Sequence, residues 1–182
     1  MVSSARRPFF AVLALAVVLS GCGYTTRSLL PDSIKAVHVT PVKNAIDLTQ
    51  ETDNAGRFRT YRPGVEVDVT NAIINRFIFD GSLRIAPLER ADAVVEARLI
   101  DYRRDPLRYS ESDDVQEYRL SVLLDASVYQ LPERKLLWHE ASLAGDTTFF
   151  LSGPRATSED EAVTIAVEDV ARRVVEKTVE IW

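Results

Sequence analysis

Apolar and polar residues alternate between residues 117 and 128, and this is the clearest structural signal in the chain. Every second residue from Tyr118 to Val128 is apolar, whereas most of the intervening residues are charged or carry a hydroxyl group. This period of two predicts a β-strand with one buried face and one solvated face. Shorter runs rich in apolar residues predict further strands at residues 34–42, 83–88, 94–102 and 135–148.

Two other segments repeat their apolar residues with the period of an α-helix. In residues 63–79 an apolar residue recurs at every fourth position, and Gly81 suits the end of this helix because glycine tolerates a left-handed conformation. A second helix is predicted to follow the capping-box pair Ser158 and Glu161 and to continue nearly to the C-terminus.

These elements follow the order strand, helix, four strands, helix. Asp105-Pro106 is expected to bend or bulge its strand, because proline cannot donate to a β-ladder. One apolar stripe on each helix and one apolar face on each long strand predict an α+β fold: a two-layer α/β sandwich, with a mostly antiparallel or mixed sheet and two helices packed on one face. We predict a single domain over residues 34–182, with a long polar loop at residues 44–62.

The N-terminus has the features of a lipoprotein signal. Two arginines precede an apolar run over residues 9–19, which is too short to span a bilayer and fits the apolar region of a secretory signal. Leu19-Ser20-Gly21-Cys22 then matches a bacterial lipobox. We predict that residues 1–21 form the signal peptide, that Cys22 receives a diacylglycerol and an N-linked acyl chain such as palmitate, and that residues 22–33 form a tether. Gly23, rather than aspartate, after the cysteine favours the outer membrane by resemblance to sorting in enteric bacteria.

Composition narrows the possible chemistry. The formal net charge of −5 argues against general nucleic-acid binding, which depends on cations that meet phosphates. Cys22 is the single cysteine, which excludes an internal disulfide and a CxxC metal site. The two histidines, His38 and His139, lie in predicted strands and are interpreted as structural. We therefore expect no enzyme activity, no metal and no cofactor; a hydrolase that uses these histidines is the least favoured alternative.

Arginines gather at two places in this acidic chain. One group is formed by residues 57, 59 and 62, and the other by Arg103, Arg104 and Arg108, while Arg155 follows Gly153-Pro154. Guanidinium groups bind phosphates and carboxylates in a bidentate manner, so these residues could contact an anionic ligand or partner. The alternative for each group is a loop with ordinary solvated charges.

Several segments, in order along nearly the whole predicted mature chain, resemble the LPS-assembly lipoprotein family LptE. They are Gly21-Cys22-Gly23-Tyr24, LPDSIK at 30–35, NAIINRFIFDGSLR at 71–84, ADAVVEA at 91–97, EYRL at 117–120 and KLLW at 135–138.

The resemblance implies a lipid-anchored protein on the periplasmic side of the outer membrane. Such a protein partners the β-barrel LptD, plugs its lumen and assists lipopolysaccharide on its way to the cell surface, without catalysis or cofactor. It also implies that Arg103, Arg104, Arg108 and Arg155 are candidate contacts for the anionic glycolipid. A periplasm-facing lipid-binding or transporter-accessory lipoprotein, unrelated to lipopolysaccharide, is the alternative.

Overall fold

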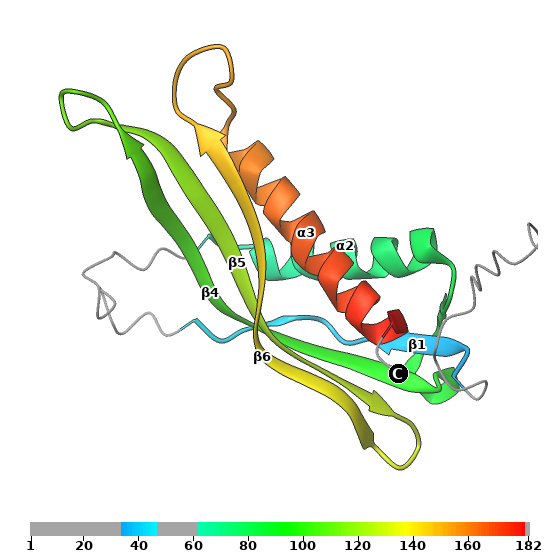
Figure 1. Ribbon diagram of the computed structural model, residues 1–182. Helices are drawn as coiled ribbons and strands as arrows, with labels where there is room; N and C mark the ends of the chain where they lie inside the picture. Colours follow the sequence, from blue (N-terminus) through cyan, green and yellow to red (C-terminus); the bar gives the residue numbers. More distant parts are fainter. Residues whose placement is uncertain (1–33, 47–61, 181–182) are drawn as a thin grey trace, which may run out of the picture.

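The computed structural model describes residues 34–46 and 62–180, which form a β-sheet covered on one face by two helices (Figure 1). The predicted α+β sandwich is therefore confirmed. Cys22, the tether and most of the predicted 44–62 loop lie outside the described residues.

Three long strands dominate the sheet within this described part of the chain. β4 (Ala93–Tyr109), β5 (Val115–Gln130) and β6 (Lys135–Phe150) form an antiparallel meander, and the sheet order is β3-β1-β4-β5-β6. β4 is longer than predicted, and a register shift between Pro106 and Arg108 confirms the expected bulge. The sheet is mixed, because three short strands pair in parallel with each other or with β4. These are β1 (Ala36–Val39), β2 (Lys43–Asn44) and β3 (Arg84–Ile85).

The strand predicted at residues 34–42 is shortened to β1, and β2 begins only after its predicted end. Pro41 lies at the break and has no N–H to donate to the sheet. The following N–H, that of Val42, donates to the hydroxyl of Thr70 at 2.9 Å instead of to a neighbouring strand. The strand predicted at residues 83–88 is also shorter, because Pro87 and the 3₁₀ turn η1 (Leu88–Arg90) follow β3.

Both predicted helices are present with the expected termini. α2 (Val65–Asp80) ends at Gly81, whose N–H donates to the Phe77 carbonyl and whose positive φ of 75° turns the chain away from the helix axis. α3 (Glu159–Glu180) begins with the predicted cap, in which the Ser158 hydroxyl accepts the N–H of Glu161 at 3.1 Å.

The core lies between the helices and the apolar face of the sheet. Leu99, Leu124 and Phe77 are fully buried there, as the alternating and helical patterns predicted. Trp138 of β6 adds a polar contact to this layer, because its indole N–H donates to the Thr178 hydroxyl of α3 at 3.3 Å.

Candidate functional site

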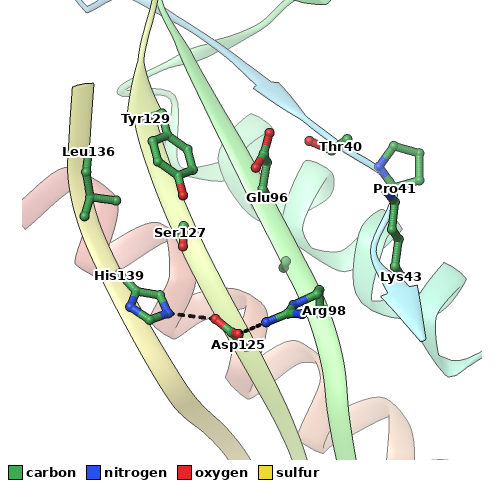
Figure 2. Close-up of a pocket in the computed structure, with 11 residues that line it drawn as sticks. Thr40, Pro41, Lys43, Glu96, Arg98, Asp125, Ser127, Tyr129, Leu136 and His139 are labelled. Carbon is green, nitrogen blue, oxygen red and sulfur yellow. Dashed lines mark hydrogen bonds and ion pairs between the residues drawn. The ribbon is translucent and has the colours of Figure 1, made fainter. Parts of the chain in front are cut away.

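The face of the sheet away from the helices, here called the open face, carries several charged and polar side chains. Glu96 and Arg98 of β4, Asp125 of β5 and His139 of β6 project from it (Figure 2). Two apolar residues of this face, Val94 and Leu123, are nevertheless buried. Ser121 of this face is also buried, so the predicted solvated face of the strands is confirmed with three departures.

A shallow pocket of about 540 Å³ lies on the open face (Figure 2). Asp125 is at its centre and accepts hydrogen bonds from Arg98 and from Nε2 of His139, the latter at 2.8 Å. Partial burial alone would raise the pKa of Asp125, but the bonds from Arg98 and His139 outweigh it and lower the pKa below its ordinary value. Asp125 is therefore held by two other residues that line the pocket, Arg98 and His139.

The alternation of β5 placed Asp125 on the solvated face, but the sequence did not predict its pairing with His139. That pairing depends on a register shift between Leu124 and Ala126, where β6 carries one extra residue. A bulge of this kind re-aims the following side chains and has no strong sequence signal here.

The predicted arginine group is divided by the sheet. Consecutive strand residues point to opposite faces, so Arg103 lies on the open face opposite Ser121, whereas Arg104 lies on the helix face opposite Leu120. Arg104 Nη1 contacts a carboxylate oxygen of Glu159, the first residue of α3, at 2.7 Å.

Local carboxylates therefore pair with Arg103 and Arg104. The other oxygen of Glu159 accepts the hydroxyl of Tyr102 at 2.8 Å, and burial, followed by this bond, raises the pKa of Tyr102. Arg103 lies 3.5 Å from Asp101. Both arginines are thus positioned by the protein itself.

Arg108 and Arg155 come together at Phe150, the last residue of β6. The guanidinium carbon lies 4.4 Å from the Phe150 ring centroid for Arg155 and 5.9 Å for Arg108. Arg108 also lies 3.6 Å from Glu117, whereas Arg155 forms no ion pair with any described carboxylate. Here the structure unites one residue of the second predicted group with the isolated Arg155. We call Arg108, Phe150 and Arg155 the arginine pair site.

The position of the arginine pair site is set by the long meander. The ends of β4 and β5 near the 110–114 turn extend beyond the helices, and the loop between β6 and α3 lies beside them (Figure 1). Of the other predicted group, Arg62 pairs with Asp160 at 2.6 Å. Arg57 and Arg59 lie outside the described residues.

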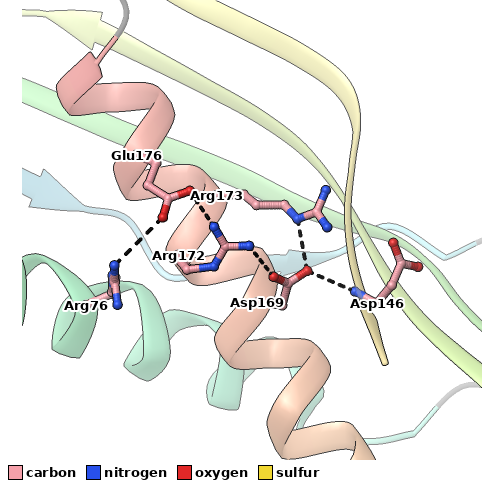
Figure 3. Close-up of polar contacts among 6 residues, drawn as sticks. All are labelled: Arg76, Asp146, Asp169, Arg172, Arg173 and Glu176. Atoms are coloured by element: carbon pink, nitrogen blue, oxygen red, sulfur yellow. Dashed lines mark hydrogen bonds and ion pairs between the residues drawn. The ribbon is translucent and has the colours of Figure 1, made fainter. Parts of the chain in front are cut away.

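A second charged network lies at the outer edge of β6 (Figure 3). Asp169 of α3 accepts the backbone N–H of Asp146 at 3.2 Å and also pairs with Arg172 and Arg173. Burial would raise the pKa of Asp169, but the bonds from Arg172, Asp146 and Arg173 together lower it. The ionised carboxylate therefore occupies a donor of the edge strand that could otherwise pair with another chain.

Within residues 34–46 and 62–180, no group of three or more His, Cys, Asp or Glu residues could hold a metal ion. His38 lies in β1, where its Nδ1 is 3.0 Å from the carbonyl oxygen of Ala86. No helix in the described part of the chain is long and apolar enough to cross a membrane.

Comparison with known proteins gives a family match. The family model described as "LptE: Lipopolysaccharide-assembly" matches residues 34–178. No curated protein matches the sequence.

Several solved structures resemble the chain. A hypothetical protein from Chlamydia trachomatis is 14% identical with a TM-score of 0.52, and the match covers 80% of this chain and 95% of that one. Lipoprotein B from Nitrosomonas europaea is 19% identical with a TM-score of 0.44, over 82% and 86% of the two chains. Rare lipoprotein B from Shewanella oneidensis is 13% identical with a TM-score of 0.41, over 77% and 89%. At these identities, the likeness to the Chlamydia structure concerns the fold alone.

Proposed function

Because this chain belongs to the LptE family of lipopolysaccharide-assembly lipoproteins, we propose that it partners and plugs the LptD β-barrel in the outer membrane. The family match over residues 34–178 is the observation that carries the proposal. The lumen of a large outer-membrane barrel is polar, and the open face offers a polar surface whose charges are largely paired. The lipobox at Cys22 supports an anchor of two or three acyl chains in the periplasmic leaflet.

The arginine pair site is the part of this surface best suited to touch lipopolysaccharide. Arg155 has no described carboxylate partner, and its guanidinium stacks on Phe150 together with that of Arg108. A guanidinium held over an aromatic ring keeps free N–H groups at its edge for a phosphate. Arg103 and Arg104 are less available to a phosphate, because Asp101 and Glu159 already pair with them.

The experiment that tests this function is purification of the lipoprotein from outer membranes in mild detergent, with identification of the proteins that accompany it. We expect a large β-barrel protein in equal amount. The Cys22→Ser variant has no thiol to acylate, so we expect that it is no longer recovered in the membrane fraction. Recovery of the lipoprotein alone, or with inner-membrane transporter subunits, would favour the lipid-transport alternative.

Replacement of Arg108 and Arg155 by glutamate should weaken binding to purified lipopolysaccharide by about tenfold to a hundredfold per residue, since a charge-assisted hydrogen bond contributes about 1.5–3 kcal/mol. Binding is measured by titration with lipopolysaccharide below its aggregation concentration.

Arg134→Glu is the matched control for these substitutions. Arg134 also stacks on an aromatic ring, 4.8 Å from the centroid of Tyr129, but lies at the turn between β5 and β6. An equal loss in this control would show that binding follows net charge only. Unchanged binding in the double variant would show that neither arginine contacts lipopolysaccharide and that both are ordinary solvated charges.

A further inference from the structure

Exposed apolar side chains gather at the end of the molecule where the described chain begins. Phe79 is 81% exposed and Ile78 is 65% exposed at the end of α2, and Leu88 is 48% exposed in η1. The end of α2, β3, η1 and the start of β1 all lie at this end (Figure 1). Soluble domains seldom display several large apolar side chains together without a partner.

Backbone contacts fix the start of the chain at this end. Asp92 Oδ2 accepts the N–H groups of Lys35 and Ala36, each at 2.9 Å. The Lys35 carbonyl in turn accepts the N–H of Arg84 in β3 at 3.0 Å. We call this surface the anchor end, formed by Lys35, Ile78, Phe79, Arg84, Ile85, Leu88 and Arg90.

The length of the tether limits how far the anchor end can lie from a bilayer. Residues 22–33 separate the predicted acylated Cys22 from the described chain. Twelve residues can span at most about 40 Å. The described chain therefore begins at the anchor end, within about 40 Å of the predicted acylated residue.

Basic side chains surround the apolar ones. Lys35, Arg84 and Arg90 are exposed, and the Arg76 guanidinium carbon lies 5.4 Å from the Phe79 ring centroid. Long basic side chains at such a boundary place their aliphatic stems against apolar surface and their charges among headgroups. Asp80 and Glu89 are exposed at the same end, so apolar insertion rather than net charge must supply most of the attraction.

We propose that the anchor end docks on the surface of a phospholipid bilayer, with Phe79 and Ile78 inserted between the headgroups. The proposal rests on the acylated Cys22 of the proposed function and adds an orientation to it. In this orientation the anchor end contacts the leaflet that holds the acyl chains, and the arginine pair site lies at the end of the domain that faces away from this leaflet.

The test uses the mature acylated protein in vesicles of phosphatidylethanolamine and phosphatidylglycerol. Acylation consumes the single native thiol, so Ser82→Cys supplies one free thiol beside the exposed end of α2. A fluorophore attached there is exposed to a quencher carried on lipid tails near the headgroups. Ser152→Cys, in the exposed loop between β6 and α3, gives the matched label at the other end.

We expect several-fold stronger quenching by the lipid-borne quencher at position 82 than at position 152. Ile78→Asp combined with Phe79→Asp should abolish this difference while the fold persists, because both side chains are exposed. Val67→Asp should leave it unchanged; Val67 is 56% exposed on the same helix, about 18 Å away along its axis.

Mass spectrometry of Cys22 separates failure of the anchor from failure of docking. An acylated protein whose label at position 82 stays open to a water-soluble quencher would show that docking is wrong and the anchor right. An unacylated protein would overturn both. Shielding that appears only when the barrel protein is added would assign the anchor end to a protein interface and reject the bilayer.

Discussion

Gly145→Ala is expected to destabilise the domain by about 3 kcal/mol, the upper part of the range for overpacked cores. Gly145 lies on the helix face of β6 opposite Val122, where α3 crosses the sheet. A Cβ added here would lie 2.3 Å from the carbonyl oxygen of Ala166, 2.5 Å from the backbone nitrogen of Val170 and 2.6 Å from the Val170 Cβ. Two of these atoms belong to the helix backbone, so α3 itself would have to move away from the sheet.

The measurement is the free energy of unfolding from denaturant titration. Ala144→Val is the matched control, because it adds volume at the neighbouring position of β6 on the open face, where the side chain is only half-buried. We expect the control to change stability by less than about 0.5 kcal/mol. A similar small effect for Gly145→Ala would mean that α3 does not rest directly on β6.

Local patterns predicted most of the regular structure. α2 and β5 each bury one face, and a buried face leaves a periodic pattern among residues that are close in the sequence. The four-residue repeat and the alternation could therefore be recognised without knowledge of the tertiary contacts. The bulge after Pro106 was predicted from that proline, whereas the end of β1 before Pro41 was not predicted. The length of β4 was underestimated, because its distal half alternates weakly and gains its order from pairing with β5.

The functional surfaces were predicted less completely. Arg103 and Arg104 were grouped because they are adjacent in sequence, but adjacency in a strand places side chains on opposite faces. Arg108 and Arg155 are 47 positions apart and meet only because β6 returns along β5. The close approach at Gly145 was also missed, since a glycine within a strand does not reveal which neighbour lies against it.

The alternation of β5 did predict the buried face, and Leu124→Asp tests that prediction directly. Leu124 is fully buried in the central strand of the meander, between Leu99 of β4 and Leu143 of β6. Loss of its side chain alone should cost about 2–5 kcal/mol, and a buried carboxylate without a partner adds to this. Since a domain of this size is stable by about 5–15 kcal/mol, we expect the variant to be largely unfolded at 37 °C by circular dichroism.

Leu136→Asp is the matched control, because it makes the same substitution at an exposed position. Leu136 of β6 is 51% exposed on the open face. We expect it to change the free energy of unfolding by less than about 0.5 kcal/mol. If some folded Leu124→Asp protein persists, burial should raise the pKa of the new carboxyl. The loss in the free energy of unfolding, relative to the native protein, should then shrink as the pH falls toward 4. A deficit that is independent of pH would show instead that the loss comes from the missing leucine side chain. A normal melting curve for Leu124→Asp would mean that the faces of β5 are reversed.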